Sequence, residues 1–504
     1  MLVIFAVLPI LALIVSLLLL KMPIKHAAGV AFVFAAVSGL LIYRMGFYGM
    51  FISIGKGLTL ALFVLLIIWS AMFLYNLVND AGAIRVIDRN ISNFIKTPFE
   101  QFLLLAWVFA PFLQGVAGYG VPVVAVVPIL LALGFDPVKT TSAVLIGHSW
   151  SICLGSMGTS YYALELVTNL PSGGLASSMV AFVIIALFLT GVTVCAFYGG
   201  IKSIKEGLFY LIPASLVMSV SLYILANIQA MSFIGMTTAL TGILTILALY
   251  HLRKGKTEKT SLYSDSLKLS EAVLPYALIF VLSIICYLLN IKTGFGFDFP
   301  GYKTGLDYIV APVQGYSKIL FFKHPAFIIL VSSLCGILLY MKKGVVDRKV
   351  LKGIGKNTVK KCIPTTITLA FLLSMALIMT DSGMTAKLSE ATVALSGLFY
   401  PIFSPFIGML GSFITASSTN SNVVFGGFQE SVALQLSMST SIMCASQIVG
   451  ASVGGSIGPT TVLMGTTAAK LTGQERLVYK LNLIPALLIV FALGIANMVI
   501  MNIF

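Results

Sequence analysis

The chain has 504 residues, of which 59% are hydrophobic and 9% are charged, and its mean hydropathy of +1.05 excludes a soluble protein of this length. This composition predicts an all-α polytopic membrane protein. The net charge of +15 would suggest nucleic-acid binding in a soluble chain. In a membrane protein, however, Lys and Arg mark the cytoplasmic loops, so we expect membrane lipid and no nucleic acid as partners.

Apolar stretches of roughly 20 residues, the length that crosses the hydrocarbon layer, predict about 12 transmembrane helices. They lie near residues 2–20, 26–43, 57–78, 139–157, 174–198, 206–226, 232–252, 271–290, 324–341, 362–380, 438–457 and 481–503. Two further apolar segments, at about 100–135 and 397–436, are too long for one span and are broken near the middle. Each is predicted to form a re-entrant hairpin.

The two halves of the chain contain matching segments. Phe112 pairs with Phe413, and Asp80-Ala81-Gly82 matches Asp381-Ser382-Gly383, about 300 residues further along in each case. We therefore predict a first repeat over residues 1–198, connecting helices and a cytoplasmic linker over 199–270, and a second repeat over 271–504.

The distribution of positive charge predicts the orientation of the two repeats. With the N-terminus outside, 24 of the 31 Lys and Arg residues fall in cytoplasmic loops. The first hairpin then enters from the cytoplasm and the second from outside, which makes the repeats inverted. Inverted repeats with interrupted helices are typical of secondary transporters, whose substrate site lies at the interruptions.

The tip of the first predicted hairpin is QGVAGYGVP. Its glycines let backbone N–H groups approach a ligand, and a helix that begins near Val121 would direct its partial positive end at an anion. Pro122 suits the first turn of that helix. The candidate binding residues here are Gln114, Gly115, Gly118, Tyr119 and Gly120.

The second tip has six consecutive polar residues: Ser417, Ser418, Thr419, Asn420, Ser421 and Asn422. Such a run is consistent with a loop and a helix cap. In an apolar context, however, every hydroxyl and amide must find a partner, which favours a role in binding a ligand or an ion.

Other candidates lie in the neighbouring spans. His148 can change charge near neutral pH, so it is a candidate for proton relay or substrate contact, with a neutral histidine that bridges two helices as the alternative. Gln447 lies in the corresponding part of the second repeat. Asp80 and Asp381 are interpreted first as helix ends, and Asp381 is a second proton-coupling candidate. Further breaks are expected at 155–159 and 455–460.

Two polar loops have alternative interpretations. The aromatic and Gly-rich segment 291–323 either caps the outer entrance or forms an aromatic belt at the membrane interface. The basic segment 342–361 either has its positive charge only because it is a cytoplasmic loop or binds anionic lipid headgroups. The sequence has no HExxH, GxSxG or P-loop motif. We therefore expect no enzyme activity, cofactor or metal, and transport driven by an ion gradient.

The runs QGVAGYGVPVVAVVPILLALGF, with GSMG downstream, and TASSTNSNVVFGGFQ, followed by GGSIGPTTV, resemble the lactate permease family of bacterial and archaeal carriers. The resemblance covers most of the chain. It implies a multi-pass carrier in the plasma membrane of a prokaryote that moves lactate, or glycolate, together with H+. The alternatives are a different small organic anion, Na+ as the coupling ion or, from other classes, a channel or a membrane enzyme.

The chain departs from the pattern that this resemblance implies at three charged positions. The family's pattern has a glutamate at Gln114, an aspartate at Ser418 and a lysine near Gly455, where this chain is uncharged. A polar and nearly neutral pocket is therefore expected, in which His148 would supply the protonatable group.

Overall fold

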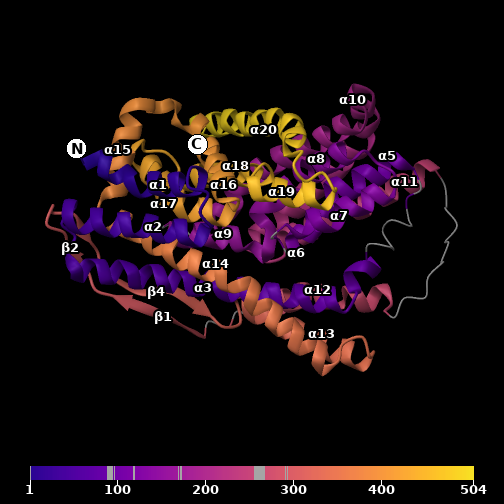
Figure 1. The fold of residues 1–504 in the computed structure, drawn as a ribbon, viewed down its shortest axis with the longest axis horizontal. Coiled ribbons are helices and arrows are strands. Elements are labelled where there is room, and N and C mark those ends of the chain that lie inside the picture. Colours follow the sequence, from indigo (N-terminus) through magenta and orange to yellow (C-terminus); the bar gives the residue numbers. More distant parts are fainter. Residues whose placement is uncertain are drawn as a thin grey trace.

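The computed structural model describes residues 2–87, 95, 97–116, 118, 120–168, 170, 173–254, 267–289, 291 and 293–503. Among these residues, ten helices are long and apolar enough to cross a membrane. The helices run mostly along the long axis of the molecule, with strands β1 and β2 at one end and helices α5 and α11 toward the other (Figure 1). The chain is therefore a helical, multi-pass membrane protein.

In the first half of the chain, the helices include two π-helical segments (η1 and η2) and one 3-10 segment (η3). They are α1 (Leu2–Leu18), α2 (Ile24–Val37), η1 (Ser38–Ile42), α3 (Gly46–Asp80), α5 (Pro98–Leu103), η2 (Leu104–Phe109), α6 (Ala110–Val116), α7 (Val121–Ala132), α8 (Pro137–Gly147), η3 (Ser149–Leu154), α9 (Gly155–Val167) and α10 (Gly174–Asn227).

In the second half, a 3-10 segment (η4) joins two helices near the second predicted hairpin. The helices are α11 (Ile234–Lys254), α12 (Leu269–Leu289), α13 (Pro325–Lys342), α14 (Arg348–Asp381), α15 (Met384–Ser396), η4 (Gly397–Phe399), α16 (Tyr400–Thr415), α17 (Ser418–Gln435), α18 (Thr440–Ser456), α19 (Pro459–Ala468) and α20 (Glu475–Ile503).

The predicted spans all fall on helices in the part of the chain that the structure describes. Two of them share α10, which is kinked at Gly199 and Gly200 by non-helical backbone angles. The ten long helices also include limbs of both predicted hairpins. Helix length alone therefore does not test the predicted number of about 12 transmembrane helices, which stays a prediction.

The all-α prediction is confirmed for the membrane-spanning part, and the segment 291–323 adds two short strand pairs to it. Strand β1 (Gly294–Phe299) pairs with β4 (Val313–Leu320), and β2 (Tyr302–Lys303) pairs with β3 (Ile309–Val310), both antiparallel. Alternating glycine and aromatic residues in GFGFDF suit a strand, whose side chains point to opposite faces in turn.

This β-segment is fastened to helix α3. The ring of Tyr302 occupies the space over Gly49 that any larger side chain would fill, and the Tyr302 hydroxyl is hydrogen-bonded to Ser53 Oγ at 2.9 Å. The Ser317 hydroxyl donates to the Thr59 carbonyl at 3.1 Å. That the segment caps the outer entrance stays a prediction.

Both predicted hairpins are interrupted where the sequence indicates. In the first, α6 ends at Val116 and α7 begins at Val121, with Gly120 in the left-handed conformation (φ 79°). In the second, α16 ends at Thr415, Ala416 has a φ of 51°, and α17 begins at Ser418. Each interruption leaves a helix N-terminus in the interior of the protein.

The two halves of the chain make reciprocal contacts. Helix α7 of the first half packs against α19 of the second, and α17 of the second packs against α9 of the first. The long helices α3 and α14, which end at the matching Asp80 and Asp381, also pack against each other. In an inverted repeat, α7 corresponds to α17 and α9 corresponds to α19, so the contact of α7 with α19 should recur as a contact of α17 with α9. Both contacts are present, which is consistent with the predicted repeat.

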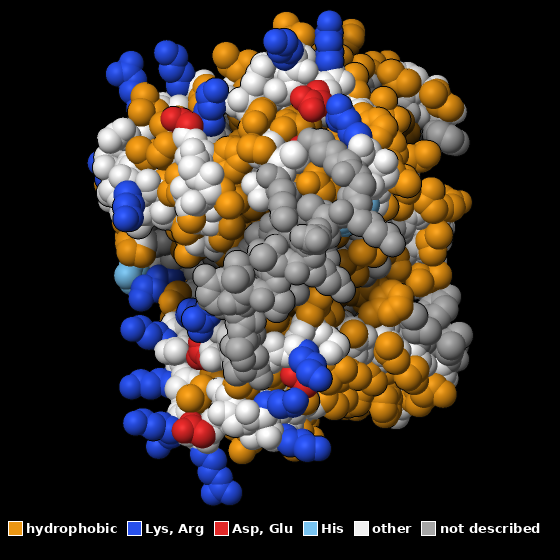
Figure 2. All heavy atoms as spheres, turned by 90° about the vertical axis from the view of Figure 1, so that its right-hand side faces the viewer, with side chains coloured by type: hydrophobic (Ala, Val, Ile, Leu, Met, Phe, Trp, Pro, Cys, Tyr) orange, Lys and Arg blue, Asp and Glu red, His pale blue; other side chains and the backbone are white. Residues whose placement is uncertain are grey.

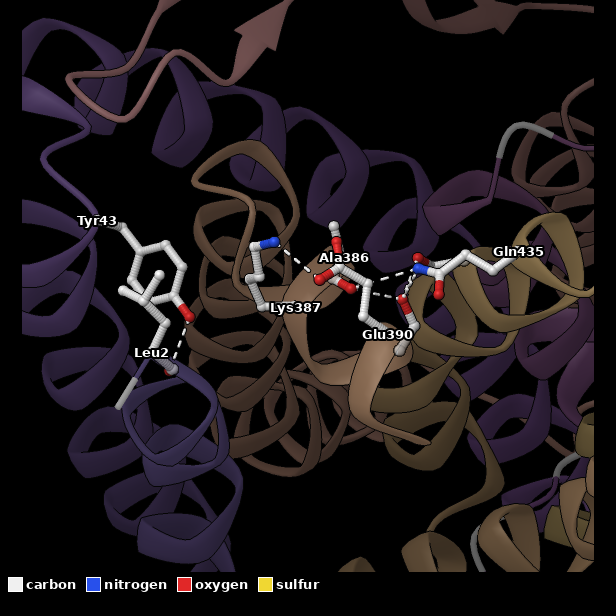
Figure 3. Close-up of polar contacts among 8 residues, drawn as sticks. Leu2, Tyr43, Ala386, Lys387, Glu390 and Gln435 are labelled. Carbon is white, nitrogen blue, oxygen red and sulfur yellow. Dashed lines mark hydrogen bonds and ion pairs between the residues drawn. The ribbon is translucent and has the colours of Figure 1, made fainter. Parts of the chain in front are cut away.

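The two ends of the molecule differ in their polar groups. The end near α5 and α11 displays many Lys and Arg side chains and few acidic ones (Figure 2). At the opposite end, Tyr43 donates to the Leu2 carbonyl at 2.8 Å, Lys387 pairs with Glu390 at 2.8 Å, and Gln435 of α17 donates to α15 (Figure 3). The basic end matches the predicted cytoplasmic side.

Candidate functional site

A cavity of about 400 Å³, here called the central cavity, lies where the interrupted helices converge. Both hairpin tips and both further breaks contribute to its wall, and α14 closes another side. Its described lining residues are Ile24, Ile68, Gln114, Gly120, His148, Ile152, Gly155, Ser156, Thr159, Ser160, Pro364, Thr365, Thr368, Leu369, Thr415, Ala416, Ser417, Ser418, Thr419, Asn420, Gly455, Thr460, Thr461 and Met464.

Four helix beginnings face this cavity. Gly120 precedes α7, Ser417 and Ser418 begin α17, and Thr460 and Thr461 lie in the first turn of α19. The fourth arises within α9, where residues 156–158 have positive φ and the helix starts anew. The first amides of a helix have no partner within it and carry partial positive charge, so together they favour a bound anion.

The further breaks at 155–159 and 455–460 are confirmed. In the first, Ser156, Met157 and Gly158 have φ values of 48°, 56° and 78°. In the second, α18 ends at Ser456 and α19 begins at Pro459. Because both breaks reach the central cavity, each half supplies two helix beginnings to its wall.

The structure brings seven of the predicted site residues to the central cavity: Gln114, Gly120, His148, Ser417, Ser418, Thr419 and Asn420. No Asp, Glu, Lys or Arg is present among the described residues that line it. The wall is thus polar without formal charge, and helix ends, hydroxyls and amides provide its electrostatics.

Gly115 and Gly118 of the first tip are not among the described residues that line the cavity. Gly115 packs against α11, since a Cβ atom there would lie 2.6 Å from the Met236 backbone nitrogen. Gly118 packs against the Ser156 side chain with φ at 63°. Tyr119 lies outside the described residues. The two glycines allow close packing of the tip against α11 and Ser156.

Ser421, Asn422 and Gln447 join helices behind the cavity wall. Ser421 donates to the Gly408 carbonyl at 2.9 Å and accepts from Gln447 Nε2 at 3.3 Å. Asn422 Nδ2 donates to both the carbonyl and the hydroxyl of Ser160 at 3.0 Å. These contacts fix α17 to α16, α18 and α9.

His148 lines the central cavity and is 2% exposed. Its Nδ1 lies 2.6 Å from the Val144 carbonyl. A carbonyl can only accept, so Nδ1 must carry a hydrogen and the neutral ring is fixed as the Nδ1–H tautomer. The other ring nitrogen, Nε2, is then the position at which a proton can be added.

Asp381 lies away from the central cavity. Its carboxylate pairs with Lys56 Nζ at 3.2 Å and accepts from the Ser53 hydroxyl at 2.7 Å. It ends α14 as Asp80 ends α3, which agrees with the interpretation of both residues as helix ends. The pair with Lys56 gives Asp381 a structural role that the sequence did not indicate.

Sequence reasoning missed several hydroxyls of the central cavity: Ser160, Thr365, Thr368, Thr460 and Thr461. Thr365 and Thr368 lie in the uninterrupted helix α14, where no break draws attention to them. Their spacing is the one available signal, because residues three apart share a helix face.

A comparison with protein families matches the description "L-lactate permease" over residues 2–504. An L-lactate permease of Streptococcus iniae is 27% identical over 88% of this chain and 93% of its own length. The glycolate permease GlcA of Escherichia coli (strain K12) is 22% identical over 98% and 94%. The solved YdaH transporter of Alcanivorax borkumensis covers 86% of this chain and 84% of its own at 12% identity, with a TM-score of 0.46.

Proposed function

This chain belongs to the L-lactate permease family as a multi-pass protein of the plasma membrane, and we propose that it transports a small monocarboxylate, lactate or glycolate, together with a proton. The convergence of four helix beginnings on the central cavity supports this proposal most directly. The volume of about 400 Å³ lies in the range of small-molecule pockets, about 300–1,000 Å³.

The substrate carboxylate would be held by backbone N–H groups at the helix beginnings and by nearby hydroxyls. Asn420 is the amide side chain of the second tip in the wall, and it makes no side-chain hydrogen bond within the described part of the chain. It is therefore available to a carboxylate or hydroxyl of the substrate. Gln114 offers a second amide from the first tip.

Proton coupling is assigned to His148, the titratable side chain among the described lining residues. A buried imidazolium without a counter-ion is costly, and so is a buried carboxylate. Bound together, the two charges offset each other, so proton and carboxylate would enter the cavity as a neutral pair. Because proton and anion would cross together, the proton gradient would drive accumulation of the anion.

The experiment is uptake of labelled L-lactate and glycolate into proteoliposomes with an imposed pH gradient, and separately with a Na+ gradient. We expect accumulation with the pH gradient alone. His148→Gln should abolish accumulation while lactate exchange at equal pH persists, since the site remains but the proton carrier is lost.

The control is His26→Gln, because His26 lies outside the central cavity. If lactate or glycolate accumulates only with the Na+ gradient, the coupling ion is Na+ and the proposed coupling to H+ is wrong. Folded protein that moves neither anion under either gradient would overturn the assigned substrate.

A further inference from the structure

A second cavity of about 520 Å³, here called the vestibule, lies beside the first hairpin tip. Its described lining residues are Met72, Tyr75, Asn79, Gly120, Val121, Val124, Ala125 and Lys361. Gly120 also lines the central cavity, so the two cavities meet at the beginning of α7.

Lys361 of α14 is the cationic side chain in the described vestibule wall. Its Nζ donates to Asn76 Oδ1 at 3.0 Å and lies 5.3 Å from the centre of the Tyr75 ring. Lys56, Lys343 and Lys387 each pair with a carboxylate, but Lys361 has no acidic partner among the described residues. Its charge is therefore held over α3 by an amide and an aromatic ring, and no described carboxylate lies within ion-pair distance of it.

A polar helix face connects Lys361 with the central cavity. Thr365 and Thr368 follow Lys361 at intervals of four and three residues on α14, so all three share one side of the helix. Thr365 and Thr368 line the central cavity. An anion leaving Lys361 would thus meet hydroxyl groups as it passes the beginning of α7.

The vestibule is much larger than the cavity found beside the equivalent helices of the other half. There, α14 and α17 together with α1, α9 and α15 line a cavity of only about 20 Å³. Lys361 belongs to the basic segment at the beginning of α14, on the Lys-rich side. The vestibule therefore lies next to the segment that is predicted to be cytoplasmic, and Figure 2 shows the Lys-rich end of the molecule.

We propose that Lys361 is a cytoplasmic binding station for the monocarboxylate, occupied before entry into the central cavity or after release from it. This inference rests on the proposed function. An unpaired cation at the mouth of a partly enclosed space raises the local concentration of anions and speeds their capture. The station acts on the cytoplasmic side alone.

The first test compares Lys361→Gln with Lys360→Gln, the adjacent exposed lysine that lies outside both cavities. Lactate transport is measured from the cytoplasmic face in inverted membrane vesicles. We expect Lys361→Gln to raise the half-saturating lactate concentration several-fold, Lys361→Arg to restore it substantially, and Lys360→Gln to match the unsubstituted protein.

The second test uses Lys361→Cys and Lys360→Cys in a background that lacks Cys335, the half-buried native cysteine. A membrane-impermeant thiol reagent should modify both variants in inverted vesicles. Added lactate should slow modification at position 361 and leave position 360 unaffected. Chloride at equal ionic strength serves as the control anion.

The outcomes separate the inference from the function on which it rests. If the unsubstituted protein moves no monocarboxylate, the proposed function fails. If it transports lactate while Lys361→Gln behaves as Lys360→Gln and lactate gives no protection, the station is overturned. An effect of Lys361→Gln that vanishes in phosphatidylcholine and returns with phosphatidylglycerol would assign Lys361 to lipid headgroups and also overturn it.

Discussion

Asn420 and Asn422 are two residues apart in α17 and have different surroundings. Asn420 lines the central cavity, whereas Asn422 is fully buried and donates to Ser160 of α9. Because both residues belong to one run of polar residues, the sequence predicts that both bind a ligand or an ion. The structure separates a candidate ligand contact from a contact that holds two helices together.

This difference predicts distinct phenotypes for two alanine variants. Asn420→Ala should abolish lactate uptake and leave thermal stability unchanged. Asn422→Ala should destabilise the protein by about 1–3 kcal/mol, because it removes two buried hydrogen bonds to Ser160. Uptake and thermal unfolding of the purified protein test both, and normal uptake by stable Asn420→Ala would remove this amide from the site.

The buried ion pair of Lys56 and Asp381 predicts a large loss of stability when one partner is removed. The two side chains are 5% and 9% exposed, so Asp381→Asn leaves a buried cation unpaired and should cost about 3–5 kcal/mol. The double variant Lys56→Met with Asp381→Asn should recover most of that stability.

Because Asp381 lies away from the central cavity, the folded double variant should still accumulate lactate under a pH gradient. Loss of accumulation with intact lactate exchange would instead make Asp381 a proton-coupling residue, which the sequence also allows.

At the scale of elements, glycines set how closely α16 and α18 approach. A Cβ atom at Gly450 would collide with the Pro405 carbonyl oxygen, and one at Gly454 with the Met409 carbonyl oxygen. Small residues at a spacing of four let helix backbones pack closely in membranes. This packing supports the second hairpin from behind, since α16 is its first limb.

Gly450→Ala should therefore destabilise the protein by about 1–3 kcal/mol through overpacking. The matched control is Gly353→Ala in α14, where the added Cβ atom meets nothing within 4 Å. Thermal unfolding of the two variants in detergent gives the comparison, and equal midpoints would show that the helices can separate without cost.

At the scale of the whole molecule, the halves of the chain meet at contacts that alternating access must change. Ser160 of α9 and Ser418 of α17 are hydrogen-bonded at 2.8 Å across these halves. If one repeat moves against the other during transport, this distance must change.

The double variant Ser160→Cys with Ser418→Cys should therefore lose uptake on oxidation and regain it on reduction. Each single variant, treated in the same way, is the control for substitution alone. Full uptake by protein whose cross-link is demonstrated by mass spectrometry would show that α9 and α17 move together.

The membrane class, the four helix interruptions and the family could all be predicted from the amino-acid sequence, because hydrophobic length, glycine and proline act locally along the chain. It indicated the hairpin tips and His148 for the same reason. Which polar residues face the central cavity could be seen only once the helices were packed together. Asn420 and Asn422 differ in the helix surface on which they lie, and the pairing of Lys56 with Asp381 joins residues far apart in the chain. Such choices depend on how helices pack, which no local pattern encodes.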